Sequence, residues 1–248
     1  DIDAVHRCIS ALQEATGGRP RITPTALEAA FAATDPEARP AFRAAADWYL
    51  HGMRTVFLQD ANSLIIRPAG LVSILAHLRR CFPGIRRITS YARSHTIAAR
   101  KETDLQAIAE AGLNRIHIGM ESGSGEVLDR MQKGVTKEQH IRAGQKVIQA
   151  GIELSEYYMP GLGGRARSDL HARESADALN KINPHFIRMR TLAIPNATPL
   201  FKEWEAGRFD KCADLQVVRE LVTFLDSLDG IASAIKSDLI LNLFGELE

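Results

Sequence analysis

Five strand-like segments each end in a short run of polar residues whose side chains could do chemistry. In chain order these runs are 59–63, 91–95, 121–125, 156–165 and 188–191. They contain carboxylate, guanidinium, amide, imidazole and phenol groups, which bind charged and hydroxylated ligands. A scaffold without a ligand needs polar residues at such places only as helix caps. The runs therefore indicate a binding or catalytic site.

Two short motifs within these runs resemble known patterns without completing them. Residues 121–125 (Glu-Ser-Gly-Ser-Gly) lack the glycine that stands two places before the serine of a hydrolase nucleophile elbow. Residues 161–166 match the G-x-G-x-x-A form of a dinucleotide-binding turn, but the next strand is followed by no acidic residue that could bind a ribose. The motifs favour a helix cap and a turn that lets a ligand approach the backbone.

Metal-binding patterns are weak in this sequence. Cys8, Cys81 and Cys212 are far apart and outside any C-x-x-C spacing. We expect them to be small buried side chains on helices, and we predict no metal site within the chain. His171 and Glu174 stand three residues apart on a predicted helix, a spacing that usually belongs to a solvated face.

The composition excludes several classes of function. With 31 Lys+Arg against 30 Asp+Glu, the net charge of +1 gives no strong nucleic-acid signal. No apolar run approaches the roughly 18 residues of a membrane span. Cysteine usage fits the reducing cytoplasm, where we expect the protein to act. A chain of 248 residues, 45% of them apolar, suits one large globular domain.

The elements that must position the polar runs alternate between strand and helix. Strands are predicted at 55–58, 87–91, 115–120, 153–159 and 185–192. Parallel strands need crossover helices, so this alternation predicts an α/β fold with a parallel sheet. The sheet could be open and doubly wound, or a whole or partial (βα) barrel. In both architectures the carboxyl ends of the strands meet at one edge, which would gather the polar runs.

Local patterns add detail to the predicted helices and to one strand. The first 50 residues and the tail from residue 200 are predicted to be helical. Capping boxes are predicted at 25–28, 103–106 and 136–139. His117 alternates with two isoleucines and must face the opposite side of its strand, where it would either line a barrel or contact a helix.

Taken together, the strand ends resemble the radical S-adenosylmethionine (SAM) superfamily. The likeness is to the branch that includes oxygen-independent coproporphyrinogen oxidases and several tRNA-modifying enzymes. The most specific block is 112–134, where a strand ends in Glu-Ser-Gly-Ser and a short helix leads to Met-x-Lys-Gly. Residues 56–63, 161–164 and 194–200 also carry the likeness, which covers roughly residues 50 to 205.

The resemblance implies a partial (βα)6 TIM-like barrel with parallel strands. In this family a CxxxCxxC loop after the first strand ligates a [4Fe–4S] cluster, and SAM binds the remaining iron. Reductive cleavage gives a 5′-deoxyadenosyl radical that abstracts hydrogen from the substrate. Because the sequence has no such motif, we expect the first strand and the cluster ligands to lie N-terminal to Asp1. The expected organisation is an N-terminal helical segment (1–52), the core barrel (53–195) and a C-terminal helical extension (196–248).

The resemblance also implies which residues would hold the methionine part of SAM. Asp60 and Asn62 would bind its ammonium group, because they follow the first predicted strand where the family has a Gly-Gly-Glu type of motif. Lys133 would lie near its carboxylate. Glu121 and Ser122 would meet either the methionyl group or the ribose hydroxyls.

The remaining implied contacts concern the nucleoside. Tyr157 would lie near the ribose, and the backbone of Gly161 and Gly163 would line the adenine. Tyr91 and Arg93 would face either the cofactor or the substrate.

The resemblance leaves the substrate unknown. Arg188 and Arg190 could anchor an anionic substrate, or they could form ion pairs with Glu153 or Glu156. The electron donor would be a protein such as flavodoxin or ferredoxin, and no membrane is expected.

Two other functions stay open at the level of the sequence. The chain could be a cluster-free barrel that binds a nucleoside or a partner protein without catalysis. It could also be a barrel lyase that grips phosphate with the turn at 161–164. A lyase of that kind needs a lysine or metal ligands at the strand ends, and no predicted strand contains a lysine.

Overall fold

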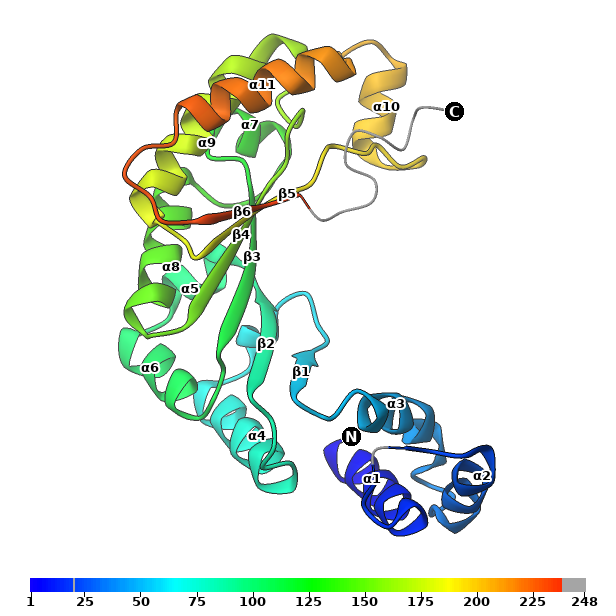
Figure 1. Cartoon of the computed structure of the whole chain (residues 1–248). Helices are drawn as coiled ribbons and strands as arrows, with labels where there is room; N and C mark the ends of the chain where they lie inside the picture. Colours follow the sequence, from blue (N-terminus) through cyan, green and yellow to red (C-terminus); the bar gives the residue numbers. More distant parts are fainter. Residues whose placement is uncertain (20, 238–248) are drawn as a thin grey trace.

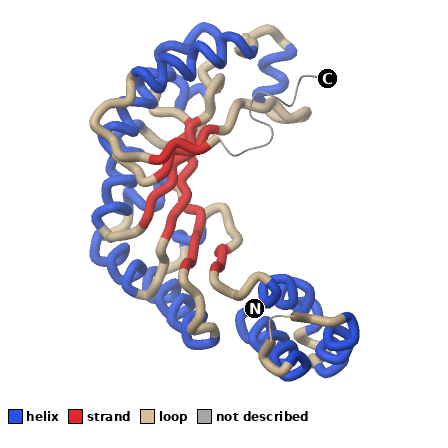
Figure 2. The backbone as a smooth tube through the Cα atoms, viewed as in Figure 1, coloured by secondary structure: helices blue, strands red, loops and turns tan. Residues whose placement is uncertain are grey.

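A six-stranded parallel sheet forms the centre of the computed structural model, which describes residues 1–19 and 21–237 (Figure 1). The strands lie side by side in chain order. They are β1 (Thr55–Leu58), β2 (Arg87–Ala92), β3 (Arg115–Glu121), β4 (Glu153–Tyr158), β5 (Phe186–Met189) and β6 (Ala234–Lys236). The sheet is curved and open, as in part of a barrel (Figure 2). The predicted α/β fold with parallel strands is confirmed.

Helices join successive strands and cover one face of the sheet, whereas the concave face stays open (Figure 2). They are α4 (Pro68–Cys81), α5 (Ser94–Ala99), α6 (Glu102–Glu110), α7 (Gly125–Arg130), α8 (Lys137–Gln149) and α9 (Ser168–Ile182). Short 3-10 turns precede α4 (Ser63–Ile65) and α9 (Arg165–Arg167). The capping box of α8 forms as predicted, with Thr136 and Gln139 each bonding the other's backbone N–H. The other two boxes do not form, because α2 is capped by Thr23 and α6 has no side-chain cap.

The register of the strands separates two faces of the sheet. Ile116 pairs with Leu154 on the helix-covered face, and both side chains are fully buried. Tyr91 pairs with His117 on the concave face. Side chains alternate along each strand, so the aromatic and charged residues point into the open barrel. His117 therefore lines the barrel and does not contact a helix.

Glu156 lies on the helix-covered face, since it pairs with Ile118 of β3 and Ile187 of β5. It is fully buried, and burial raises the pKa of its carboxyl group well above the ordinary value. The side chain faces away from Arg188 of β5, which pairs with Tyr157 on the concave face. The predicted alternative of ion pairs is wrong for Glu156, and Glu153 pairs with Arg115 at 2.6 Å.

Three helices precede the sheet: α1 (Ile2–Thr16), α2 (Pro24–Ala33) and α3 (Arg39–Leu50). Figure 1 places them beside β1, at the start of the sheet. Trp48 of α3 donates a hydrogen bond of 2.8 Å from Nε1 to the carbonyl of Thr55, the first residue of β1. Leu12 of α1 and Phe42 of α3 belong to the same buried apolar core as Leu75 of α4, which covers the sheet.

The segment after β5 contains α10 (Pro199–Glu205) and α11 (Asp214–Asp226) and then β6. The helical prediction for this tail is wrong at 234–236, where β6 pairs with β5 in parallel. β6 ends in Lys236, so one strand does contain a lysine, although its side chain is exposed. Residues 238–248 of the predicted C-terminal extension lie outside the described residues.

Candidate functional site

Two neighbouring cavities open at the carboxyl ends of the strands. The first has a volume of about 640 Å³ and the second about 580 Å³. The residues common to both are Ala61, Tyr91, Gly119 and Glu121. Because both cavities share this wall, they form the part of the barrel where loops from β1, β2, β3 and β4 meet.

The structure gathers most of the predicted site residues around these cavities. Asp60, Tyr157 and Arg190 line the first cavity, and Arg93 and Lys133 line the second. Tyr91 and Glu121 belong to both. These side chains come from five different strands or from the segments that follow them. The parallel topology brings them together, as the sequence predicts for polar runs at strand ends.

Glu121 has the most constrained geometry of the residues in this wall. It ends β3 at a shift in register and has a φ of 61°, in the left-handed region that glutamate rarely adopts. Its Oε2 lies 2.7 Å from Nζ of Lys133. Its Oε1 lies over Gly119, where a Cβ would be only 3.0 Å away. The absence of a side chain at Gly119 therefore leaves the space that the carboxylate occupies.

A row of rings crosses the concave face below the cavities. Phe57, Tyr91, His117 and Tyr157 come from four successive strands, with ring centroids between 4.9 and 6.0 Å apart. The guanidinium of Arg190 lies 4.6 Å above the ring of Tyr157. A cation over an aromatic face is attracted by the ring quadrupole, so Tyr157 holds Arg190 at the cavity wall.

The electrostatics of this row favour neutral rings. Burial, and then the nearby charge of Arg188, lowers the pKa of His117 to about 4, so its imidazole is neutral near pH 7. Burial also raises the pKa of Tyr91, and its hydrogen bond with Tyr157 adds to the effect. The positive charges at this wall therefore come from arginine, not from histidine.

Five predicted site residues line neither cavity, and one of them is Arg188 of β5, which lies beside Tyr157 of β4. Asn62 joins two loops, because its Nδ2 donates to Thr96 at 2.9 Å and its Oδ1 accepts from the N–H of Arg93 at 3.1 Å. Ser122 is fully buried and its Oγ accepts from the N–H of Ser124. Gly161 and Gly163 are buried in a turn behind the first cavity and line neither one.

The turn at 161–164 is packed against neighbouring protein groups. The N–H of Gly161 donates to the carboxylate of Glu220 at 2.9 Å. A Cβ on Gly163 would lie 3.0 Å from His171 and 3.1 Å from the carbonyl of Arg167. These glycines allow close packing of α9 and α11, so the turn offers no grip for a phosphate.

Sequence reasoning missed Glu220 and misjudged His171. Glu220 is only 2% exposed, and the side chain of His171 is fully buried. His171 does not form a surface pair with Glu174, because its Nδ1 lies 2.9 Å from Glu220. The spacing of Val217, Glu220 and Phe224 on the buried side of α11 is a signal that could have found the carboxylate.

The cysteines of the described chain do not converge. Cys8 is buried in α1 as predicted, but Cys81 is only half-buried, and Cys212 is buried in the loop before α11 instead of on a helix. Within residues 1–19 and 21–237, one group of potential metal ligands gathers, formed by Asp3, His77 and Cys81. It contains a single thiol, so it does not fit an iron–sulfur cluster held by three cysteines.

Comparison with known proteins gives the family of this fold and cavity. The sequence model of the radical SAM superfamily matches residues 41–174, which is more than half of the chain. The chain belongs to the radical SAM superfamily. This family uses SAM and a [4Fe–4S] cluster, and its enzymes commonly need a reductant. The match contains the wall residues Asp60, Tyr91, Glu121, Lys133 and Tyr157.

Curated relatives of this radical SAM chain include tRNA-modifying enzymes. The tRNA uridine(34) acetyltransferase of Methanocaldococcus jannaschii is 22% identical over 131 residues, which are 51% of this chain and 24% of that protein. The tRNA-2-methylthio-N(6)-dimethylallyladenosine synthase of Geotalea uraniireducens is 27% identical over 177 residues, which are 67% and 40% of the two chains. The radical SAM chain thus spans only a quarter to two fifths of these relatives.

Solved structures share the fold of this radical SAM chain. Elp3 of Methanocaldococcus infernus, lacking its N-terminus, has a TM-score of 0.60 at 14% identity, over 79% of this chain and 52% of that one. Coproporphyrinogen III oxidase of Escherichia coli, a radical SAM enzyme, has a TM-score of 0.54 at 14% identity, over 69% and 40% of the two chains. None of the helices within residues 1–19 and 21–237 is long and apolar enough to cross a membrane.

Proposed function

We propose that the chain is the catalytic core of a radical SAM enzyme that cleaves SAM reductively and abstracts hydrogen from a substrate. The observation that carries the proposal is the convergence of Asp60, Tyr91, Glu121 and Tyr157 on one cavity at the strand ends. In a chain of this family, a cavity of that kind is the place for the cofactor.

The donors and acceptors of the cavity fit SAM, which has an ammonium group, a carboxylate and a ribose. Asp60 and Glu121 would bind the ammonium and hydroxyl groups, and Lys133 would bind the carboxylate. Gly119 supports this assignment, because it leaves space where a side chain would otherwise lie against the Glu121 carboxylate. Tyr157 and Tyr91 supply hydroxyls to the lining of the first cavity.

The three cysteines Cys8, Cys81 and Cys212 do not fit a [4Fe–4S] cluster. We propose that the cysteine ligands of the cluster come from outside the 248 residues. Bound together, SAM and the reduced cluster supply a 5′-deoxyadenosyl radical for hydrogen abstraction. We further propose a cytoplasmic location and a flavodoxin or ferredoxin as the reductant.

The substrate would enter along the concave face below SAM. Arg190 is the proposed anchor for an anionic group, since it lines the first cavity and lies over Tyr157. Arg188 of β5 stands two residues before Arg190 and faces the same side of the sheet. It is the second proposed anchor. The tRNA-modifying relatives support an anionic substrate of this type.

The experiment that tests this function uses the full-length gene product purified without oxygen and reconstituted with iron and sulfide. We expect a visible charge-transfer band and formation of 5′-deoxyadenosine when SAM and a reductant are added. Glu121→Gln should lower the rate of 5′-deoxyadenosine formation, while Glu126→Gln, on the exposed side of α7, should not. A preparation with neither the band nor the product would contradict the proposal.

A cluster-free binding protein is the second candidate, favoured by the separation of the three cysteines. The two candidates differ in how SAM binds. An enzyme of this family uses iron for much of its grip on SAM, so the chain without a cluster should bind SAM weakly in calorimetry. Tight binding by the cluster-free chain would favour the second candidate instead.

A further inference from the structure

We propose that Glu220 and His171 are positioning residues of the SAM site: they hold Glu121 and the turn after β4 in the conformation that faces the cofactor. The inference rests on the proposed function. Both positioning residues lie outside the residues that carry the family resemblance most specifically, and one of them belongs to α11.

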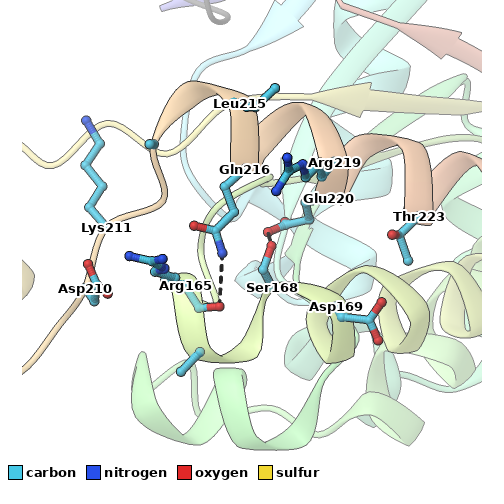
Figure 3. A pocket seen from close by; sticks show the side chains of 12 residues that line it. Arg165, Ser168, Asp169, Asp210, Lys211, Leu215, Gln216, Arg219, Glu220 and Thr223 are labelled. Atoms are coloured by element: carbon cyan, nitrogen blue, oxygen red, sulfur yellow. Dashed lines mark hydrogen bonds between the residues drawn. The ribbon is translucent and has the colours of Figure 1, made fainter.

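The carboxylate of Glu220 is the centre of a buried network. Its Oε1 accepts hydrogen bonds of 2.9 Å from the hydroxyl of Tyr158, the N–H of Gly161 and the Nδ1 of His171. Its Oε2 accepts from the hydroxyl of Ser168, toward which Glu220 reaches from α11 in Figure 3. One side chain of α11 thus binds the end of β4, the glycine turn and the start of α9.

His171 extends this network to the wall of the cavity. Its Nε2 lies 3.3 Å from the carbonyl oxygen of Glu121, while its Nδ1 faces Glu220. A carbonyl and a carboxylate both accept hydrogen bonds, so each ring nitrogen of His171 faces an acceptor. Burial alone would raise the pKa of Glu220. The interactions with His171 and the hydrogen bonds from Ser168 and Gly161 lower the pKa by more, so it lies below its ordinary value.

The backbone of Glu121 needs such support. A glutamate with a φ of 61° is in a region that costs free energy and persists only where the surroundings hold it. Two donors reach its carbonyl: the N–H of Met159 at 3.0 Å and the ring of His171. Together they fix the peptide plane, and this plane sets the direction in which the carboxylate leaves the backbone toward Lys133.

The network also reaches the cavity by a second route. Tyr158 and Met159 both line the first cavity, and Tyr158 donates to Glu220 from the face of β4 that the helices cover. Its ring stacks on Phe224 of α11, with centroids 4.1 Å apart. Loss of the Glu220 carboxylate would therefore loosen two neighbouring parts of one wall, the end of β3 and the end of β4.

A purely structural role is the competing explanation, since a buried ion pair of this kind also attaches α11 to α9. The test compares Glu220→Gln with Leu179→Ala in the full-length protein. Leu179 is fully buried on the same helix as His171, and its apolar side chain can form no hydrogen bond with the network. Its truncation should lower the melting temperature through a cavity alone.

Hydrogen–deuterium exchange is the first readout and needs no cofactor. We expect Glu220→Gln to speed exchange at the N–H groups of Met159 and Gly161 more than its fall in global stability explains. Leu179→Ala should change these two positions only in proportion to global stability. Equal behaviour of the two variants would overturn the inference. His171→Gln tests the same amides if Glu220→Gln fails to fold.

SAM binding to the cluster-loaded protein is the second readout. We expect Glu220→Gln to weaken binding about tenfold, in the range typical of coupling between sites, and Leu179→Ala to leave it unchanged. Wild-type affinity in Glu220→Gln would overturn the positioning role while leaving the proposed function intact. If the wild type itself binds no SAM, the proposed function fails, and the exchange experiment still decides whether Glu220 orders the wall.

Discussion

The carboxylate of Glu121 and the ammonium group of Lys133 lie 2.7 Å apart, across the second cavity wall. Glu121 comes from the end of β3, and Lys133 follows α7. The pair fixes the loop at 131–134 against the strand, and it sets one negative and one positive group side by side. Such a pair suits a zwitterionic ligand, which can bind a charge of each sign.

Removing the lysine should separate ligand binding from stability. We expect Lys133→Gln to weaken SAM binding in calorimetry, because the carboxylate of the ligand loses its cation. The half-buried pair should contribute at most about 1 kcal/mol to the free energy of unfolding. Lys137→Gln is the matched control, since Lys137 forms an ion pair of 2.8 Å with Asp177 away from the cavities. The same loss of SAM binding in both variants would refute the assignment.

A methyl group at Gly119 should displace the Glu121 carboxylate. The added Cβ would lie 3.0 Å from Oε1, which is the mobile end of a side chain, so stability should fall by less than about 1 kcal/mol. SAM binding should weaken, as measured by equilibrium dialysis. At Gly123 the added Cβ would lie 2.5 Å from the carbonyl oxygen of Glu174, which is backbone. Gly123→Ala should therefore cost about 2–3 kcal/mol of stability, and equal stabilities of the two variants would contradict this geometry.

Asn62 distinguishes a structural from a ligand-binding role. Its two hydrogen bonds join the loop after β1 to the start of α5. Asn62→Ala should lower the free energy of unfolding by roughly 0.5–1.5 kcal/mol for each hydrogen bond that it removes. Urea denaturation measures this effect. A variant with unchanged stability but no SAM binding would instead support direct contact with the cofactor.

Protonation of His140 should make stability depend on pH. Burial, and then the charge of Lys133, lowers its pKa to about 4, whereas an unfolded histidine titrates near 6.5. The unfolded state therefore binds the proton first as the pH falls, and stability declines between about 6.5 and 4. From pH 7.5 to 5 the loss from this residue should be about 2 kcal/mol. His140→Gln should flatten the profile measured by urea denaturation, and His51→Gln, at an exposed site, should not.

Much of the fold follows from periodicity in the sequence, and the exceptions have physical causes. Five strands coincide with strand-like segments of four or more residues that alternate with helical patterns. β6 escapes this reasoning because it is a three-residue strand whose side chains are all exposed, so no burial pattern marks it. The boxes at Thr25 and Thr103 fail because Pro24 and Glu102 begin the two helices one residue earlier, which places both threonines inside the first turn.

The candidate site was predictable where topology alone places a side chain. Asp60, Glu121 and Tyr157 reach one cavity because parallel strands end at the same edge. The direction of Asn62 depends on partners from another loop, and that of Gly161 depends on a carboxylate 59 residues further along the chain. Interactions at such a separation leave no local pattern in the sequence, so only the structure could reveal them.

The position of Glu220 on α11 has a consequence for where this protein can be divided. The predicted core boundary at residue 195 would remove α11, and with it the acceptor shared by Tyr158, Gly161, Ser168 and His171. Four donors would then lose the acceptor that they share, which is costly. We therefore expect the barrel and its tail to unfold as one cooperative unit and to be inherited together when barrels of this kind are recombined.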